Sequence, residues 1–429
     1  MTVLIVGAGI GGLTTALCLA KSLAISPDNN LAKPNSESTS RAKSTRTTRH
    51  KLVLLEQAPA FTEAGAGLQC GANAMQVFQH LGLAEAIHKL AVQPERIEFS
   101  HFQTGQSLHR VPLGASYEQR FGAPYLHIHR ADLLKILVNE AQQNPNIRIE
   151  LNTKVTSFEE CENTVKVSAE DGRQFEGALL VASDGVKSVV RERLTPQTLA
   201  NRNQPTSFTG SCAWRGVVPR DRLPPNFMDK VTHNFVGQGK HMIVYYLRRQ
   251  ELINFVGVVE SKTSQEASWM SRAPWQELQQ DFNGWYSTVE QVINAVDKDA
   301  CFKWALHAYK PLNNWSSKRI TLLGDAAHAA LPYMASGAAM AIEDARVLAR
   351  CLESTDLSSQ TELATALQRY QANRIPRTSR VQKTSKYLGK LYHIQNELLL
   401  RSAFWGLRNF TAGREDFLPR YNANTVALH

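Results

Sequence analysis

Three glycines near the amino terminus limit the possible fold more than any other feature of the chain. Gly7, Gly9 and Gly12 follow the apolar run Thr2–Val6, and the helix-like stretch Leu13–Ser22 comes after them. In such a strand–turn–helix unit the first glycine permits a tight turn, the second lets a pyrophosphate approach the backbone, and the third lets helix and strand pack closely. The amino end of the helix then faces the phosphates with its partial positive charge. The pattern favours a Rossmann-like α/β domain.

The second strand of this unit is predicted at Lys51–Glu56, after an unusually long connection. Residues 26–50 are rich in Ser, Thr, Asn, Lys and Arg and have no apolar periodicity, which is typical of a disordered surface insertion. Loops between such elements usually have about 2 to 6 residues. Once the insertion is removed, Glu56 lies at the usual distance of about 20 residues from the glycines, where an acid accepts hydrogen bonds from a ribose diol.

Two more turns follow strand-like runs later in the chain. Asp184-Gly185 comes after Leu179–Ala182, and Gly324-Asp325 comes after Arg319–Leu323. Ligands of α/β sheets bind at the carboxyl ends of the strands, so each aspartate could bind a hydroxyl chain or order amides that face a phosphate. Either turn alone is also consistent with an ordinary surface turn. Three such turns in this order are far more specific.

Composition limits the class of protein. The chain is 43% hydrophobic and 20% charged, which is ordinary for a soluble globular protein. Its six cysteines form no C-x-x-C pair and have no histidines at metal-ligand spacing, so we expect reduced thiols in a cytoplasmic protein and no metal site. The formal charge of +10 comes with no nucleic-acid-binding motif, and no nucleic-acid partner is expected. No run approaches the roughly 20 apolar residues of a membrane span, so no integral membrane segment is expected.

Four further segments accompany the three turns and identify a family resemblance. They are Glu63–Gln69 with Asn73-Ala74, His129–Leu133, Ala213–Gly216 and Gly324–Ala345. With them, the chain resembles over almost its full length the class A flavoprotein monooxygenases, which are single-component, FAD-dependent aromatic hydroxylases. It is most similar to their salicylate hydroxylase-like branch, which includes hydroxybenzoate and hydroxynicotinate hydroxylases.

The resemblance implies a resident FAD. In the family, Arg130 would contact FAD, Asp184 would lie in a motif linked to both FAD and NAD(P)H, and Asp325 would bind the ribitol and pyrophosphate region. The helix starting near Gly337 would aim backbone N–H groups at the flavin N1–C2=O. Family members often have Gln where this chain has Ser336, but backbone donors do not depend on that side chain. The expected FAD site comprises Gly7, Gly9, Gly12, Glu56, Arg130, Asp184, Gly185, Gly324, Asp325, Gly337 and Ala338.

The resemblance also implies a reaction. NADH or NADPH reduces the flavin, O2 forms a hydroperoxide at its C4a carbon, and an OH group passes to an electron-rich ring. A base matched to neutral pH helps, because a phenolate ring is the stronger nucleophile. His241 and Tyr245 lie four apart on a predicted strand and so face the same side. They match a His/Tyr pair of relatives and are the candidate base and hydrogen-bonding partner, although ordinary sheet-face residues fit equally well.

Other residues are candidate substrate contacts, but each also fits an ordinary structural role. Trp214 and Arg215 could anchor a carboxylate, or form a packed indole with a salt-bridged Arg, and Pro332 occupies a position that often borders the substrate. We interpret His328 as a support for its turn. Basic residues recur at a spacing that winds around a helix, and this favours a solvated basic helix over a membrane or partner surface. They are Arg374, Arg377, Arg380, Lys383, Lys386 and Lys390.

The expected architecture is α/β, and α+β overall. Strand-like runs at Ser211–Val218, Thr232–Val236, His241–Leu247 and Leu252–Glu260 predict an antiparallel substrate-binding sheet inserted into the FAD-binding domain. The FAD-binding domain is expected at residues 1–95, 126–204 and 301–360, the sheet domain at 96–125 and 205–300, and a C-terminal helical region at 361–429.

The function predicted is hydroxylation of a small aromatic acid or phenol by a monomer or homodimer. A hydroxylase of a quinone precursor or other larger ring, and a flavin-binding redox or interaction protein that hydroxylates nothing, are the alternatives. The sequence leaves open the substrate, the position of attack, loss of a carboxyl group, and the choice between NADH and NADPH.

Overall fold

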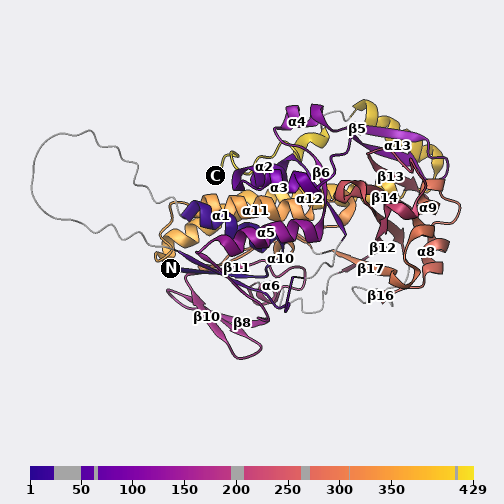
Figure 1. The fold of residues 1–429 in the computed structure, drawn as a ribbon. Coiled ribbons are helices and arrows are strands. Elements are labelled where there is room, and N and C mark those ends of the chain that lie inside the picture. Colours follow the sequence, from indigo (N-terminus) through magenta and orange to yellow (C-terminus); the bar gives the residue numbers. More distant parts are fainter. Residues whose placement is uncertain (24–49, 62–65, 195–206, 262–270, 309, 411–413) are drawn as a thin grey trace, which may run out of the picture.

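The computed structural model describes residues 1–23, 50–61, 66–194, 207–261, 271–308, 310–410 and 414–429 (Figure 1). The predicted insertion, residues 26–50, lies outside the described residues apart from His50.

The amino-terminal unit is a five-stranded parallel sheet. The strand order is β18 (Ile320–Leu322), β11 (Leu179–Ala182), β1 (Thr2–Val6), β2 (Lys51–Leu55) and β7 (Ile147–Glu150). Helices α1 (Ile10–Leu23), α11 (Gly337–Leu352) and α5 (Arg130–Gln143) pack together on one side of it (Figure 1). The antiparallel strands β8 (Val155–Glu160), β9 (Val165–Ala169) and β10 (Gln174–Gly177) lie on the other side. Burial on both faces explains why the central strands are continuously apolar.

The second unit is an eight-stranded sheet. Its order is β16 (Ser271–Arg272), β17 (Phe302–Ala308), β12 (Ser207–Pro219), β15 (Leu252–Glu260), β14 (Lys240–Leu247), β13 (Thr232–Gly237), β4 (Arg96–His101) and β5 (Ser107–Pro112). Two features differ from the expectation. The sheet is not purely antiparallel, because β13 and β4 pair in parallel. It also extends past residue 300, because β17 pairs with β12 before the chain returns to the parallel sheet.

The two faces of the large sheet have different neighbours. One face packs against α8 (Trp275–Asp281) and α9 (Ser287–Ala295) through side chains such as Met242 and Phe255. The other contributes Ala213, Val236 and Val258 to an apolar cluster with the C-terminal helices. Since side chains alternate along a strand, neighbouring residues of β12 and β14 take part in different halves of the structure.

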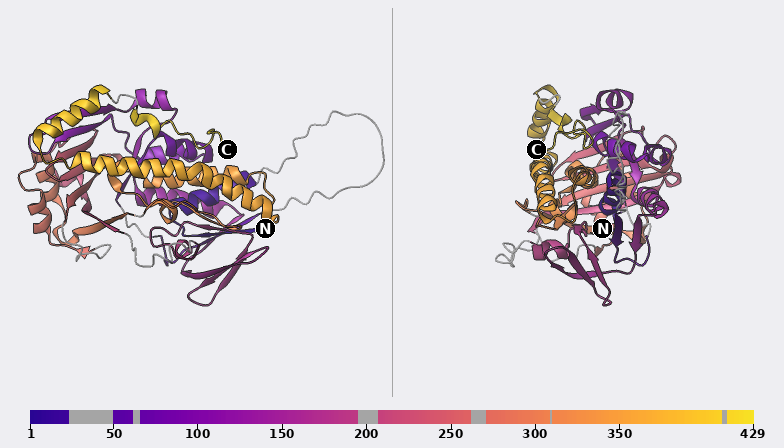
Figure 2. Two further views of the ribbon diagram at one scale, coloured as in Figure 1. Left: turned by 180° about the vertical axis from the view of Figure 1, so that it is seen from behind. Right: turned by 90° about the vertical axis from the view of Figure 1, so that its left-hand side faces the viewer.

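Helix α12 (Gln360–Tyr392) joins the two units. It runs along the molecule from the parallel sheet to the large sheet (Figure 2). Helix α13 (Glu397–Phe410) then packs near β5. The remaining elements are the paired strands β3 (Gly67–Cys70) and β6 (Leu126–His129), the helices α2 (Ala72–Leu81), α3 (Ala84–Leu90), α4 (Ala115–Phe121), α6 (Val189–Leu194) and α10 (Asp325–His328), and single turns that include η5 (Pro332–Met334).

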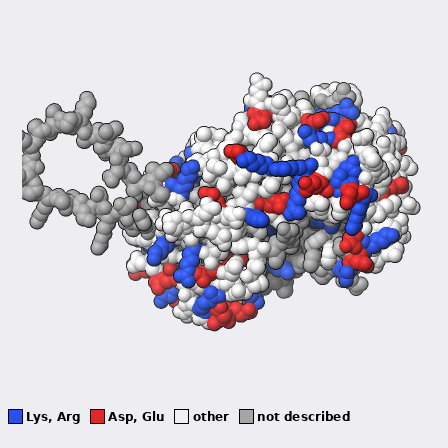
Figure 3. Space-filling view, in the orientation of Figure 1, with Lys and Arg blue, Asp and Glu red and all other residues white. Residues whose placement is uncertain are grey.

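Charged side chains of both signs share the face of the molecule drawn in Figure 3. Lysine and arginine side chains alternate there with acidic ones, so the positive charge does not gather into one patch on that face. Within the described ranges, every helix is too short or too polar to cross a bilayer.

Candidate functional site

The glycine turn between β1 and α1 is shaped by close backbone contacts. Gly7 has a φ of 90°, and a Cβ on Gly12 would lie 1.9 Å from the Gly7 carbonyl oxygen, so a side chain is excluded there. The Ser183 hydroxyl lies 2.9 Å from the carbonyl oxygens of both Val6 and Gly7 and shares its one proton between them, which attaches the second turn to the first. By contrast, a Cβ on Gly9 would meet nothing within 4 Å. The backbone at Gly9 is therefore open to a close ligand, as a bound pyrophosphate requires.

Glu56 lies beside this turn at the carboxyl end of β2. One carboxylate oxygen accepts from the Ala8 amide at 2.8 Å and the other from the Ala58 amide at 2.9 Å. These bonds fix the orientation of the carboxylate. Each oxygen keeps further acceptor capacity, which suits a ribose diol.

Asp184 contacts the glycine turn from β11. Its Cα lies 3.2 Å from the position of a Gly7 Cβ. Its Oδ2 is 3.4 Å from the Val190 amide, whereas its buried Oδ1 has no hydrogen-bond partner among the described residues. Burial raises the pKa of this carboxyl group. A buried polar atom without a partner is rare, and a ligand hydroxyl or amide would satisfy it.

The third turn meets the amino end of α11. Gly324 has a φ of 63°, and the exposed Asp325 follows it. Asp325 Oδ1 is 3.9 Å from the position of a Gly337 Cβ, so two residues predicted for the flavin end lie side by side. No side chain caps α11, because the Ser336 hydroxyl donates to the Met334 carbonyl. The amides of Gly337 and Ala338 are thus left without a side-chain cap at a 16-residue helix with a positive amino end.

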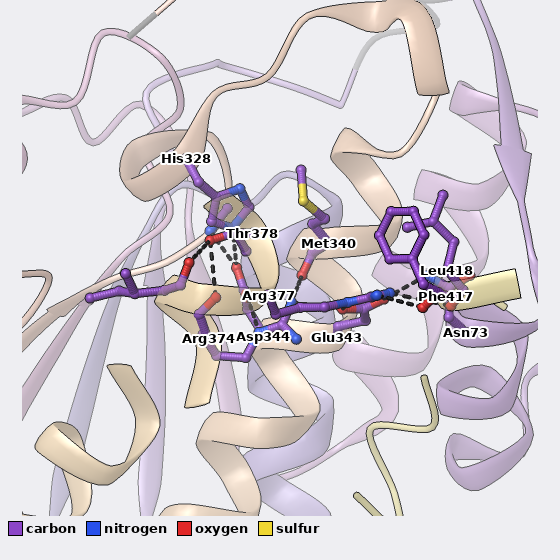
Figure 4. A network of polar contacts seen from close by, with 12 residues as sticks. Asn73, His328, Met340, Glu343, Asp344, Arg374, Arg377, Thr378, Phe417 and Leu418 are labelled. Atoms are coloured by element: carbon purple, nitrogen blue, oxygen red, sulfur yellow. Dashed lines mark hydrogen bonds and ion pairs between the residues drawn. The ribbon is translucent and has the colours of Figure 1, made fainter. Parts of the chain in front are cut away.

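A buried ion cluster lies beneath this third turn (Figure 4). We define it as Glu343 and Asp344 of α11 with Arg374 and Arg377 of α12. Arg374 reaches Glu343 at 2.8 Å and Asp344 at 2.6 Å, and Arg377 reaches Glu343 at 2.9 Å. Asp344 also accepts the Gly324 amide at 3.0 Å. The cluster therefore connects α12 directly to the backbone of the third turn.

The ion cluster corrects one prediction. A solvated basic helix is wrong for Arg374, whose side chain is fully buried, and for Arg377, which is 8% exposed. The later members, Arg380, Lys383, Lys386 and Lys390, are exposed. Burial alone would raise the pKa of Asp344, but the neighbouring His328 and Arg374 hold it at about 2. His328 Nε2 lies 2.6 Å from Asp344, consistent with its predicted support of the turn.

Arg215 and Tyr245 approach the same region from the large sheet. Tyr245 packs against His127 with tilted rings whose centroids are 4.3 Å apart, and it hydrogen-bonds Gln69. Burial raises the pKa of Tyr245. The Arg215 guanidinium interacts electrostatically with Tyr245, Arg130 and Asp325, and its buried Nε has no partner among the described residues. Arg215 is thus within electrostatic range both of the predicted flavin end and of Tyr245 on its own face of the sheet.

Trp214 lies elsewhere, and the structure corrects its prediction as a substrate contact. The indole is 1% exposed and its Nε1 donates to Asp281 of α8 at 2.7 Å. The Lys303 ammonium lies 5.0 Å from the ring centroid. Because side chains alternate along β12, Trp214 points to α8 while Arg215 points to the opposite face.

His241 shares the face of Tyr245 but is deeply buried. It is 1% exposed, and its Nδ1 lies 2.9 Å from Nε2 of His393, which follows α12. Tyr333 and Tyr392 pack on it with ring centroids 5.4 and 5.3 Å away. Tyr333 directly follows Pro332, so η5 lies against the candidate base.

The comparisons with known proteins agree with this geometry. Residues 1–385 match the family model described as "FAD binding domain". The chain belongs to this FAD-binding family. It is 32% identical over 94% of its length to the 3-hydroxybenzoate 6-hydroxylase of Polaromonas naphthalenivorans (strain CJ2), covering 92% of that protein. It is 34% identical over 77% of its length to the 6-hydroxynicotinate 3-monooxygenase of Bordetella bronchiseptica (strain ATCC BAA-588 / NCTC 13252 / RB50), covering 83%.

A solved structure supports the same fold. The chain superposes on a salicylate hydroxylase substrate complex with a TM-score of 0.76 and 24% identity, covering 99% of this chain and 96% of that one. The resemblance to FAD-dependent hydroxylases is therefore confirmed, and the protein is an FAD-dependent monooxygenase.

A cavity of about 950 Å³ opens in this monooxygenase between the large sheet, α4, α12 and the segment before α11. Its walls are mainly apolar, with polar groups at intervals. Pro332 is not on the wall, but the four residues after it are; other lining residues include Gln69, Phe99, Asn234, Ile243 and Tyr387. Ile243 lies between His241 and Tyr245 on the same face of β14, so the cavity reaches the predicted sheet face.

Two buried polar residues of the monooxygenase, Asn254 and His393, are not indicated by the motifs of the sequence. Asn254 is fully buried, and its Oδ1 accepts the Gly67 amide at 2.7 Å, joining β15 to β3. An asparagine inside the apolar run of β15 was the signal, because a buried amide needs a partner. No pattern near His241 indicated His393. In the described part of the chain, no three His, Cys, Asp or Glu residues gather as metal ligands.

Proposed function

We propose that this FAD-dependent monooxygenase hydroxylates the ring of a small aromatic acid or phenol of the hydroxybenzoate, hydroxynicotinate or salicylate type. NADH or NADPH and O2 would be the co-substrates. The observation that carries the proposal is the meeting of the flavin end, at Asp325 and Gly337, with Arg215 and Tyr245 of the large sheet. Relatives that hydroxylate hydroxybenzoate and hydroxynicotinate support the substrate class.

The cofactor would be held along the three turns. Gly9 and Glu56 would receive the pyrophosphate and a ribose, and Asp184 would offer its unpaired oxygen. Asp325 and the amides of Gly337 and Ala338 would hold the flavin half, because an uncapped helix amino end stabilises negative charge. When bound, FAD supplies electron transfer and oxygen activation.

The large sheet would handle the substrate. Arg215 would attract the carboxylate of an aromatic acid, since its buried Nε is unpartnered among the described residues. Tyr245 would hydrogen-bond the substrate hydroxyl. His241 would take the hydroxyl proton and so make the ring more nucleophilic. Burial lowers the pKa of His241 well below its ordinary value, which keeps the imidazole neutral but also makes it a weaker base, so uptake of the substrate proton has to be coupled to release of another.

The proposal is tested with purified protein and a panel of aromatic acids and phenols. The protein should be yellow, a fitting aromatic should accelerate NAD(P)H oxidation, and the product should have gained one oxygen atom by mass. His241→Ala should reduce hydroxylation far more than FAD content. The proposal fails if no member of the panel stimulates oxidation or gains oxygen. FAD binding with NAD(P)H oxidation but no oxygenated product would indicate a non-hydroxylating redox protein.

A larger ring is the second candidate. The cavity of about 950 Å³ lies at the upper end of the roughly 300–1,000 Å³ usual for ligand pockets, more than a single-ring acid needs. The panel should therefore include two-ring phenols and quinone precursors. A higher kcat/KM for these than for single-ring acids would favour this candidate.

Cellular setting and assembly complete the proposal. We expect a cytoplasmic enzyme that is a monomer or homodimer. All six cysteines are free thiols, which fits a reducing compartment. Light scattering of the purified holoenzyme measures the assembly directly.

A further inference from the structure

We propose that His393 and Glu260 form a relay that carries the substrate proton from His241 to solvent. This relay rests on the proposed function, because His241 must first receive that proton. We call His241, His393 and Glu260 the histidine chain. Its members come from β14, the end of α12 and the end of β15, so only the folded protein brings them together.

The distances and the exposure form a path from the interior to the surface. His241 Nδ1 lies 2.9 Å from His393 Nε2, and His393 Nδ1 lies 3.3 Å from a carboxylate oxygen of Glu260. His241 is 1% exposed and His393 is 7% exposed, whereas the Glu260 side chain is 51% exposed. A proton that leaves His241 in this direction therefore arrives at a group in contact with water.

The Glu260 carboxylate, 3.3 Å from His393 Nδ1, determines the tautomers that we infer for both imidazoles. An ionised carboxylate only accepts, so His393 carries its proton on Nδ1 and offers a lone pair at Nε2. His241 must then donate from Nδ1 to His393. This leaves the lone pair of His241 on Nε2, which has no hydrogen-bond partner among the described residues. The atom left free is the one a base needs.

The proton balance follows from these tautomers. The substrate O–H bond breaks and its proton binds His241 Nε2, while the proton on His241 Nδ1 passes to His393 Nε2. The proton on His393 Nδ1 passes to Glu260 and then to water. Both imidazoles end neutral in the other tautomer, and the same path in reverse restores them when the product oxygen is protonated.

The surroundings of the chain suit transfer without a charged intermediate. Burial lowers the pKa of His393 to about 4 and that of His241 well below its ordinary value, so both imidazoles stay neutral. The titratable groups packed against them are the phenols of Tyr333 and Tyr392, and the Tyr333 hydroxyl is turned to Ser211 at 3.4 Å. Glu260 is the charged group at the outer end.

The first test determines the tautomers of His241 and His393 in the absence of substrate. The holoenzyme labelled with ¹⁵N-histidine is measured by NMR, and His241→Gln and His393→Gln spectra assign the two signals. Both imidazoles should carry their proton on Nδ1, and Glu260→Leu should remove that preference. Glu397→Leu is the matched control, because Glu397 is 60% exposed and lies 3.8 Å from another buried histidine, His101. A proton on Nε2 of either residue in the wild type overturns the relay.

The second test measures the transfer itself. The oxidised holoenzyme is mixed rapidly with 3-hydroxybenzoate, without NAD(P)H, and phenolate formation is followed by absorbance from pH 6 to 10. His393→Gln and Glu260→Gln should slow it by about tenfold or more, as expected for loss of a proton-transfer partner, while ligand affinity and FAD content stay unchanged. Glu397→Gln should match the wild type. Acetate in solution should restore the rate of Glu260→Gln but not of His393→Gln.

The two tests separate the two proposals. If Glu260→Gln and Glu397→Gln behave alike, the relay is overturned even when the wild type hydroxylates the aromatic. If no aromatic on the panel is hydroxylated, the proposed function fails, and the tautomers still decide whether the histidine chain is ordered as inferred.

Discussion

The ion cluster and the histidine chain are both buried polar networks, but they differ in how their charges and hydrogen-bonding atoms are paired. In the ion cluster, two carboxylates meet two guanidinium groups, and all four carboxylate oxygens accept an ion pair or hydrogen bond. In the histidine chain, one end is ionised and half exposed, and the other end is a nitrogen without a partner in the described structure. The ion cluster also contains an atom without a partner among the described residues, Arg374 Nη1, but its charges are matched and it holds the fold. The free atom of the histidine chain is instead a basic nitrogen, which can take up a proton.

The two networks also support different parts of the site. Asp344 of the ion cluster accepts the amide of Gly324 and so positions Asp325 at the flavin end. The histidine chain lies on the sheet face and reaches no predicted cofactor residue. We therefore expect damage to the ion cluster to reduce stability and FAD content together, and damage to the histidine chain to change proton transfer.

Arg374→Ala should give the largest effect. It removes the cation that contacts both Glu343 and Asp344, and leaving one negative charge of the buried cluster uncompensated costs about 3–5 kcal/mol of the free energy of unfolding. FAD content should fall as well, because the third turn loses its anchor. Urea unfolding and the flavin-to-protein ratio measure both.

Arg380→Ala on the same helix is the matched control, because Arg380 is exposed. It should change the free energy of unfolding by no more than about 0.5 kcal/mol. If Arg374→Ala costs less than about 1 kcal/mol, the ion cluster does not hold the fold as argued.

His393→Phe should change how stability depends on pH. The pKa of His393 is about 4 in the folded protein and 6.5 ordinarily. Between pH 4 and 6.5, His393 is therefore protonated in the unfolded chain but neutral in the folded protein. Stability is therefore full above pH 6.5 and is lost as the pH falls towards 4, by up to about 3 kcal/mol. In urea unfolding across that range the variant should lose less stability than the wild type, while His80, His127 and His241, whose pKa values burial also lowers, keep their contributions in both proteins. If the free energy of unfolding of the variant and of the wild type changed with pH in the same way, this contribution of His393 would be refuted.

Much of the FAD half could be predicted because its determinants are contiguous. Each turn combines a short apolar strand with glycines and an acid within a few residues, and such local patterns specify the backbone directly. The large sheet was also expected, from alternating runs. The parallel pairing of β13 with β4 was not, because it joins residues that are 135 positions apart, such as Thr232 and Ile97, and neither run encodes its partner.

The wrong predictions for the basic helix and for Trp214 also arise because a local pattern does not show which distant residues a side chain contacts. The spacing of the basic residues of α12 predicts a solvated face, but Glu343 and Asp344 lie in an apolar stretch of α11 and require buried cations. That requirement could have indicated Arg374. Strand alternation could have shown that Trp214 and Arg215 do not share a face. No local pattern could have paired His241 with His393, which is 152 residues away.

Asp344→Asn should give a smaller effect in a lower pH range. The pKa of Asp344 is held at about 2 against an ordinary 3.8, so its contribution is full above pH 3.8 and is lost as the pH falls through about 2. The difference corresponds to about 2 kcal/mol. Acid unfolding of the wild type should show this step and the variant should not. Asp171→Asn, at an exposed turn, should retain it.

Gly9→Ala should have the smallest effect on stability and separates the ion cluster from the cofactor. An added methyl group at Gly9 meets no protein atom within 4 Å, so the unfolding curve and the acid step of the apoprotein should match those of the wild-type apoprotein. FAD affinity should fall by about tenfold, equivalent to about 1.4 kcal/mol, because the methyl group occupies the approach of the pyrophosphate. Flavin fluorescence titration measures the affinity. Gly12→Ala is the contrasting variant, since its Cβ would lie 1.9 Å from the Gly7 carbonyl and should destabilise even the apoprotein. If Gly9→Ala also removed the loss of stability between pH 3.8 and 2, the ion cluster would depend on the glycine turn rather than on its own matched charges.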